Sequence, residues 1–176
     1  MMWFARPTFI IQRSFLFLYS AHRLQHLLVS PALLGDLYCF IKIYLDTPGG
    51  LLSETMSLAT VMIMSKTPVV TVNIAEAYSG GCLLLLAGHK RYTLPYAKAM
   101  IHTGSGGTVG TYEQTEQAQK NYRKQIDEMG SYILERSGMD EKIYKKNKAK
   151  DWYMDANEQK QYGIVHEIVT SLDEII

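Results

Sequence analysis

The feature that most constrains the fold is one uninterrupted strand–turn–helix–strand pattern. Residues Ile41–Leu45 alternate in polarity and end at the turn sequence Asp46-Thr47-Pro48-Gly49-Gly50. Residues Leu51–Lys66 then repeat apolar side chains at helical spacing, and Thr67-Pro68 ends that pattern. The uncharged run Val69–Ile74 is typical of a parallel strand buried on both faces. This order predicts a right-handed β-α-β crossover and therefore an α/β fold.

The rest of the chain continues as short strands and helices without a linker or an internal repeat. Its longest helical pattern is Tyr112–Arg136, and Ser137-Gly138 follow it. The glycine-rich stretch Thr103–Thr111 predicts a loop or an irregular strand. The other expected elements are a buried helix over Cys82–Ala87, strands over Arg91–Leu94, Ala99–His102 and Ile164–Val169, a basic helix over Asp140–Asn147, and a helix from Asp155 to Gly163.

Composition excludes several classes of protein. The chain has 176 residues, 47% of them hydrophobic and 20% charged, which suits one folded domain rather than a disordered chain. The net charge of +1 offers no bulk electrostatic basis for binding nucleic acid. Cys39 and Cys82 are too few for a disulfide scaffold and lack zinc-site spacing, so we expect reduced thiols and a cytoplasmic location. No apolar run reaches the roughly 18 residues that a membrane helix needs.

A metal-free acyl hydrolase needs a nucleophile, a base and donors for the oxyanion, and the turns at strand ends offer candidates. Ser79 follows the buried strand and precedes the buried helix, so it lies among the free N–H groups of a helix start. Gly80 has no side chain to keep its N–H from an oxyanion. In the turn at Pro48, Gly50 offers a second unhindered N–H. The alternatives are an ordinary N-cap serine and a tight turn without further role.

His102 is the candidate base because it ends a short strand, where catalytic groups collect in α/β proteins. Asp151 is the candidate carboxylate that orients it. Asp151 separates the basic run Lys145–Lys150 from the apolar Trp152-Tyr153-Met154, so it could be partly buried and need a partner. A structural histidine and a solvated loop aspartate are the alternatives. The rival histidines are His22, His26, His89 and His166.

Four segments in order carry a resemblance to a known family. They are Ile43-Tyr44-Leu45-Asp46-Thr47-Pro48-Gly49-Gly50, Ala75-Glu76-Ala77-Tyr78-Ser79-Gly80-Gly81, Met100-Ile101-His102 and Lys150-Asp151-Trp152-Tyr153-Met154-Asp155-Ala156. With their separations, they resemble the ClpP family, the proteolytic subunits of Clp proteases, which are self-compartmentalised serine peptidases. The resemblance runs from about Ile41 to the C-terminus.

The resemblance implies roles for single residues. Ser79 matches the nucleophile of the family, His102 the general base and Asp151 the carboxylate that orients the base. Gly50 and Gly80 match the two backbone donors of the oxyanion hole. The implied activity is that of a serine endopeptidase that hydrolyses peptide bonds in unfolded polypeptides.

The resemblance also implies an architecture and partners. The expected fold is α/β of the ClpP/crotonase type, with stacked βαβ units and a protruding strand-helix handle at about 103–136. In the family, such handles interlock two heptameric rings into a tetradecamer with the active sites inside, and an AAA+ unfoldase feeds it. We therefore expect a homo-oligomer, with an unfoldase as candidate partner. The subunit itself is expected to use no cofactor and no metal, since ATP is used only by the unfoldase, and to bind neither nucleic acid nor membrane.

The chain departs from the family pattern at three places. Thr103-Gly104 replaces the usual Gln-Pro after the histidine, Gly80 replaces a common Met, and Lys150 replaces a frequent Arg. These changes affect the expectations for ring pairing and cleavage preference more than those for catalysis. Residues 103–110 and 151–153 are most similar to ClpP-like proteins of prophage and firmicute type, which can act in phage head maturation.

Two other functions stay open. Crotonases share the fold and hold a thioester enolate with two N–H groups, but this chain shows no separate glutamate pair to serve as acid and base. Some ClpP relatives are inactive ring subunits, which usually lose a triad member, whereas all three matching residues are present here. A catalytically impaired ring subunit therefore remains the alternative to an active peptidase.

Residues 1–35 have a composition of their own. They carry three arginines and no acidic residue, a net charge of +3, which leaves −2 for the rest of the chain. This is the composition of a transit peptide, so a mitochondrial or other organellar location is the alternative to the cytoplasm. In a ClpP-like chain, however, Ser14–Tyr19 can form a strand and Ala21–Leu34 a helix. We therefore expect a divergent N-terminal segment over 1–12 and a single peptidase domain over 13–176.

Overall fold

The computed structural model describes residues 8–11 and 40–175. Its strands are β1 (Thr8–Ile11), β2 (Ile41–Thr47), β3 (Val69–Tyr78), β4 (Lys90–Thr93), β5 (Lys98–Ile101), β6 (Trp152–Met154) and β7 (Glu167–Ile168). Its helices are α2 (Leu52–Met64), α3 (Gly80–Ala87), α4 (Tyr112–Ser137), α5 (Glu141–Asn147) and α6 (Ala156–Gln161), with a 3-10 turn η1 (Leu172–Glu174). The mixed α/β fold expected from the sequence is confirmed.

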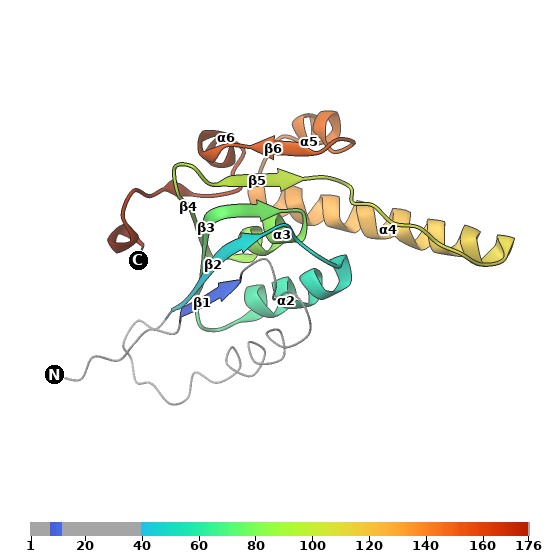
Figure 1. Cartoon of the computed structure of the whole chain (residues 1–176), viewed down its shortest axis with the longest axis horizontal. Coiled ribbons are helices and arrows are strands. Elements are labelled where there is room, and N and C mark those ends of the chain that lie inside the picture. The colour runs from blue at the N-terminus through green and yellow to red at the C-terminus, as the bar shows by residue number, and fades with distance from the viewer. Residues whose placement is uncertain (1–7, 12–39, 176) are drawn as a thin grey trace.

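The strands form one seven-stranded sheet around β3 (Figure 1). Strands β1, β2, β3, β4 and β7 follow one another in parallel, and β5 pairs in parallel with the later residues of β3. Only β6 is antiparallel, and it pairs with β5. Because β3 is long enough to pair with β4 first and β5 afterwards, the sheet branches at the end of β3 that leads into Ser79.

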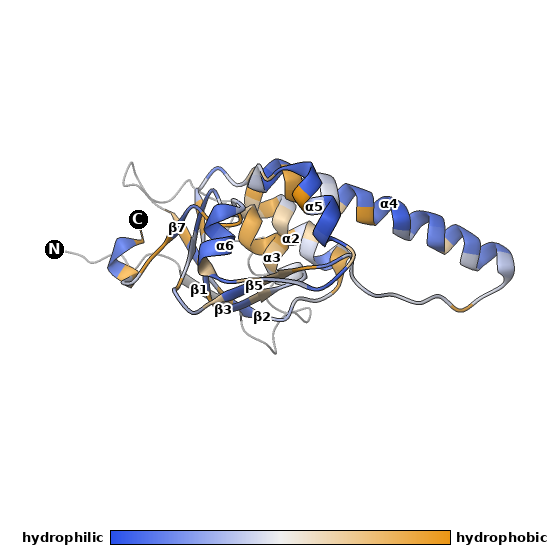
Figure 2. Cartoon of the chain, turned by 90° about the horizontal axis from the view of Figure 1, so that it is seen from above, coloured by the Kyte–Doolittle hydropathy of each residue, from blue (hydrophilic) through white to orange (hydrophobic). Residues whose placement is uncertain are grey.

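The predicted β-α-β unit is present as β2, α2 and β3, with β2 and β3 parallel. The first five residues of β3 are buried, as expected for a strand covered on both faces. All residues of α3 are buried, and this helix packs against α2 and β3 (Figure 2). The predicted helix over Cys82–Ala87 begins earlier than expected, so Ser79 stands directly before its first turn.

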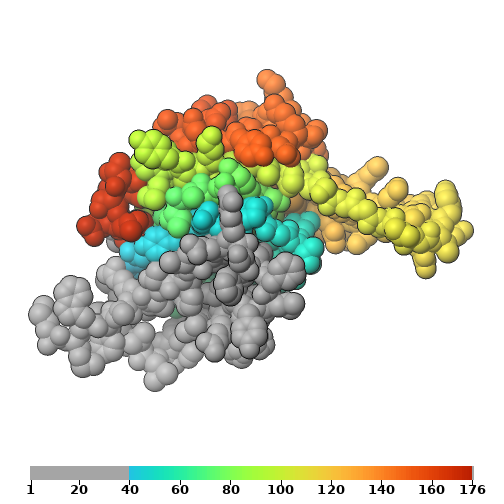
Figure 3. Space-filling view, in the orientation of Figure 1, coloured from blue at the N-terminus to red at the C-terminus, as the bar shows by residue number. Residues whose placement is uncertain are grey.

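Helix α4 projects from the body of the molecule (Figure 3). It begins with a capping box between Thr111 and Gln114 and ends at Gly138, whose φ of 71° is left-handed. Its buried residues, Met129, Gly130 and Ile133, all lie in its second half, so its first half extends as a mainly hydrophilic rod (Figure 2). The expected strand-helix projection is therefore a helix preceded by an irregular segment. The glycines of 103–111, including Gly104 at φ 79°, account for the missing strand.

Other details differ from the sequence-based expectations. The final strand is only Glu167–Ile168 instead of Ile164–Val169. Strand β6, which the sequence did not predict, is held by its pairing with β5. The strand predicted for Ser14–Tyr19 and the helix predicted for Ala21–Leu34 lie outside the described residues, as does Cys39, whereas Cys82 is a free, buried thiol. Strand β1 lies within the first twelve residues and pairs with β2.

A buried amide network joins β6 and α6 to the centre of the sheet. Gln159 of α6 donates hydrogen bonds from Nε2 to the carbonyl oxygens of Ala97 and Met154, at 2.9 and 3.3 Å. Its Oε1 accepts a hydrogen bond of 3.1 Å from Asn73 Nδ2, which also donates to the Lys98 carbonyl. Both side chains are fully buried, so the network fixes β6 relative to β3 and β5.

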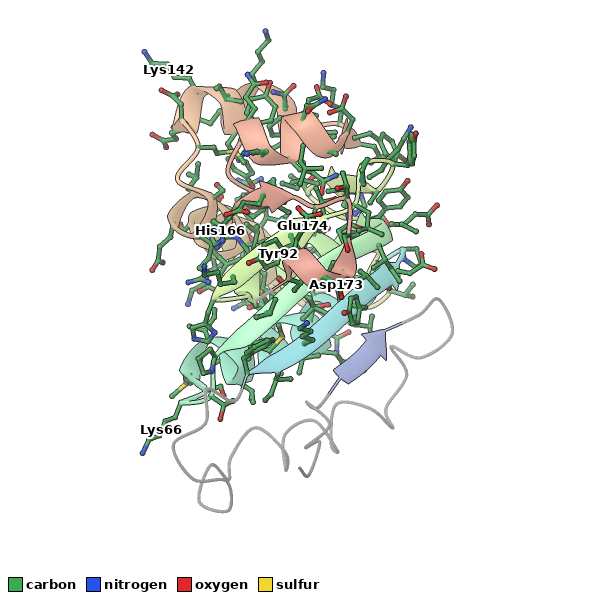
Figure 4. All side chains as sticks on the ribbon, turned by 90° about the vertical axis from the view of Figure 1, so that its left-hand side faces the viewer. Lys66, Tyr92, Lys142, His166, Asp173 and Glu174 are labelled. Atoms are coloured by element: carbon green, nitrogen blue, oxygen red, sulfur yellow. The ribbon has the colours of Figure 1, made fainter. Side chains whose placement is uncertain are left out.

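Two histidines hold backbone N–H groups at the edges of β4. His89 Nδ1 accepts a hydrogen bond from the Val69 N–H at 3.0 Å, and His166 Nδ1 accepts one from the Arg91 N–H at 3.1 Å. His166 directly precedes β7, which pairs with β4 near Tyr92 (Figure 4). Partial desolvation, followed by nearby arginines, lowers the pKa of each histidine below its usual 6.5.

We expect the free energy of unfolding to fall as the pH is lowered from 7.5 to 5.5. Below about 6.5 the unfolded chain binds protons at His89 and His166 that the folded protein resists, so protonation favours unfolding. The Glu174 carboxylate, whose pKa is lowered by hydrogen bonds from Ser171 and Thr170, titrates below this window. Urea unfolding at the two pH values measures the change. The double variant His89→Gln, His166→Gln should show a smaller decrease in the free energy of unfolding. An equal decrease would contradict the assignment of the pH dependence to these two histidines.

Candidate active site

Ser79 occupies a strained turn between β3 and α3. Its φ of 53° and ψ of −119° make it the only residue other than glycine with a positive φ among those the structure describes. Its side chain makes no capping hydrogen bond to α3, although it stands at the N-cap position. Strain of this kind persists where the surrounding structure holds it, and here the Ser79 N–H donates to the Met100 carbonyl at 2.8 Å. The reading of Ser79 as an ordinary N-cap serine is therefore not supported.

The registers of β5 bring the three predicted side chains together. Tyr78 pairs with Met100 in the parallel β3–β5 ladder, and Ile101 pairs with Trp152 in the antiparallel β5–β6 ladder. Ser79 follows Tyr78, His102 follows Ile101, and Asp151 precedes Trp152. Ser79 Oγ lies 2.9 Å from His102 Nε2, and His102 Nδ1 lies 3.1 Å from Asp151 Oδ1.

The carboxylate of this row is more exposed than the sequence suggested. The side chain of Asp151 is 58% exposed and that of His102 is 24% exposed. Asp151 therefore keeps part of its surface covered and has the partner that the sequence suggested, His102, but most of its side chain is exposed in the single chain. An aromatic contact holds β6 against the end of β3 near Asp151. Tyr153 of β6 packs edge-on against Tyr78 of β3, with 5.5 Å between the ring centroids.

Two backbone N–H groups lie beside Ser79. One belongs to Gly80, the first residue of α3, and the other to Gly50, which lies in the turn after β2. A Cβ placed on Gly80 would be 3.3 Å from Gly50 N, so the two donors are close together. Neither N–H has a hydrogen-bond acceptor among the described residues. Two free N–H groups close together are what the binding of an oxyanion requires.

Thr55 of α2 explains one departure from the family pattern. Its Oγ1 would lie 2.5 Å from a Cβ on Gly80, so a methionine does not fit at position 80 unless Thr55 moves. Thr55 is fully buried, and its hydroxyl has no partner within the described part of the chain. Thr55 was not among the residues that the sequence indicated, because nothing in its local pattern separates it from other helix-interior residues.

A cleft of about 260 Å³ opens beside Ser79 and His102. The Gly50–Leu52 and Thr103–Ser105 segments form two of its sides. Its apolar lining comes mainly from Leu52, Leu83, Met100, Ile101, Met129 and Ile133. The cleft therefore adjoins the nucleophile candidate with a surface suited to an apolar side chain.

Comparison with protein families places the chain in one of them. The family model described as Clp protease matches residues 36–172, which is most of the chain. The chain belongs to the Clp protease family. The match confirms, at the level of the family, the resemblance stated from four short segments. Members of this family are peptidases that generally assemble into oligomeric rings.

The described histidines that were alternatives to His102 lie away from the site. His89 and His166 bind backbone N–H groups at the edges of β4, and His22 and His26 lie outside the described residues. Within the described residues, no three His, Cys, Asp or Glu side chains gather as a metal site. None of the described helices is both long and apolar enough to cross a membrane.

Proposed function

We propose that this member of the Clp protease family is a serine endopeptidase that uses Ser79, His102 and Asp151. The observation that carries the proposal is the continuous row of side-chain contacts from Ser79 Oγ through His102 to Asp151. The free N–H groups of Gly50 and Gly80 stand beside it, where an oxyanion would form. A nucleophile, a base, an orienting carboxylate and two donors are the parts that acyl transfer requires.

The chemistry follows from these positions. His102 Nε2 removes the proton from Ser79 Oγ as the oxygen attacks a peptide carbonyl, and Asp151 stabilises the resulting imidazolium at Nδ1. The N–H groups of Gly50 and Gly80 stabilise the tetrahedral oxyanion, each by about 3 kcal/mol. His102 then protonates the leaving amine. A water molecule, deprotonated by His102, releases the acyl group from Ser79.

The proposal extends to the setting of the reaction. We infer a homo-oligomeric chamber, unfolded polypeptides as substrates, an AAA+ unfoldase as the user of ATP, and a cytoplasmic location. The support is membership in a family that generally forms rings, together with helix α4, which projects from the body as a handle would. The contact row favours an active peptidase over an impaired ring subunit, and it favours acyl transfer over crotonase chemistry, which needs no such row.

A fluorophosphonate probe tests the proposed nucleophile. The probe should label the wild-type protein at Ser79, because a hydroxyl activated by His102 attacks phosphorus as it would a carbonyl. Labelling is read by intact mass and the site by peptide mapping. Ser79→Ala should abolish the label, whereas Ser53→Ala, which removes an exposed serine of α2, should keep it. Labelling at a residue other than Ser79, or none at all, would contradict the proposal.

A further inference from the structure

Tyr122 of α4 contacts the segment that directly follows His102. Its hydroxyl donates a hydrogen bond of 3.1 Å to the Thr103 carbonyl oxygen. A Cβ placed on Gly104 would lie 3.3 Å from that hydroxyl oxygen, and one on Gly106 would lie 3.8 Å from two ring carbons. The half-buried ring therefore packs against the glycine-rich segment and is held there at its hydroxyl end.

Tyr122 also lines two cavities. One is the cleft of about 260 Å³ beside Ser79 and His102, which has a largely apolar lining. The other is a groove of about 450 Å³ between the glycine-rich segment and α4. Its polar lining includes Gln119, Asn121 and Gln125. Among the described residues Tyr122 alone lines both, which places its ring at their boundary, and we call this ring the wall between them.

A bound peptide would meet this wall with one particular side chain. When its carbonyl carbon is attacked by Ser79 and its oxygen lies between the N–H groups of Gly50 and Gly80, the side chain before the scissile bond lies next to the cleft, because Ser79 and both glycines line that cleft. The apolar floor of that cleft includes Leu83 and Ile133. The space available to this side chain is therefore bounded toward α4 by the Tyr122 ring.

We propose that Tyr122 is a specificity-determining residue whose ring limits the size of the substrate side chain before the scissile bond. This inference rests on the proposed peptidase function. Removal of the ring joins the cleft to the groove over α4 and admits larger side chains. Removal of the hydroxyl alone leaves the wall in place, because the ring carbons still lie beside Gly106.

The test compares two fluorogenic peptides that differ only before the scissile bond, one with tryptophan and one with alanine there. In Tyr122→Ala, the kcat/KM ratio of the tryptophan to the alanine peptide should rise about tenfold. In Tyr122→Phe the ratio should stay within about twofold of wild type. The ratio is independent of how much enzyme is folded. Arg123→Ala, at the next and exposed position of α4, should leave the ratio unchanged.

Three results are informative. An unchanged ratio in Tyr122→Ala overturns the inference, and so does a ratio in Tyr122→Phe that rises as far as in the alanine variant. Where the alanine variant does not fold, Tyr122→Leu removes the flat ring, keeps apolar bulk against the body and is expected to give the same rise. A wild-type protein that cleaves neither peptide and does not react with the fluorophosphonate probe marks the failure of the proposed function, and the inference fails with it.

Discussion

Replacing Ser79 by alanine should lower kcat for a fluorogenic peptide by about 10⁶-fold, which is the typical loss when the nucleophile of a serine peptidase is removed. The substitution deletes one oxygen, the atom that lies 2.9 Å from His102 Nε2. The N–H groups of Gly50 and Gly80 remain, so the residual rate should still exceed that in water by about 10³-fold. Initial rates measured at saturating peptide test the expectation.

The fold and assembly should be unaffected by the same substitution. Ser79 Oγ makes no capping bond to α3, and the backbone bond from its N–H to Met100 is retained in the variant. Size-exclusion chromatography should therefore give the same elution volume for Ser79→Ala and wild type. Ser53→Ala serves as the matched control and should retain full activity. Full peptidase activity in Ser79→Ala would refute the assignment of the nucleophile.

Replacing Gly49 by alanine should impair both stability and catalysis. Gly49 has a φ of 98°, and an added Cβ would lie 2.6 Å from the Tyr78 carbonyl oxygen and 2.8 Å from Gly80 N. Left-handed backbone and overpacking together should cost about 2–4 kcal/mol of the free energy of unfolding. Relief of the clash moves the turn that carries Gly50 away from Ser79. The loss of one oxyanion donor should then lower kcat by about 10²-fold or more.

Gly138→Ala provides a control that separates backbone strain from the clash. Gly138 also has a positive φ, 71°, but a Cβ there would meet nothing within 4 Å. Its replacement should cost about 1 kcal/mol and leave kcat unchanged. Urea unfolding and peptide hydrolysis of both variants provide the comparison. If Gly49→Ala were no more damaging than Gly138→Ala, then the close approach of the Gly49 turn to Gly80 would not matter for the site.

Local pattern was sufficient for the elements whose signals are strong and short in range. The turn at Pro48, the run Val69–Ile74 and the long helical repeat before Gly138 each predicted an element that the structure contains. Strand β6 was missed because three residues carry too little periodicity, and it is a strand only because β5 pairs with it. The last strand was overestimated because an apolar run does not specify how many of its residues find a partner.

The candidate site also divides into features that the sequence indicated and features that depend on contacts between distant segments. The candidate residues at positions 79, 102 and 151 and the glycines at 50 and 80 were recognisable from the sequence because they lie in the four segments that resemble the family. Their meeting depends on two ladder registers, and registers arise from contacts between segments far apart in the chain. The exposure of Asp151 and the wall formed by Tyr122 were also invisible locally.

By itself, the sequence determined the α/β class, the family and the chemical identity of the candidate catalytic groups, because these depend on residue type and short-range order. Only the tertiary structure decided how close Ser79, His102 and Asp151 lie, why Gly80 must remain small beside Thr55, and where the cleft ends. The physical reason is that these properties depend on packing between α2, α3, α4 and three strands, whose mutual positions no local interaction specifies.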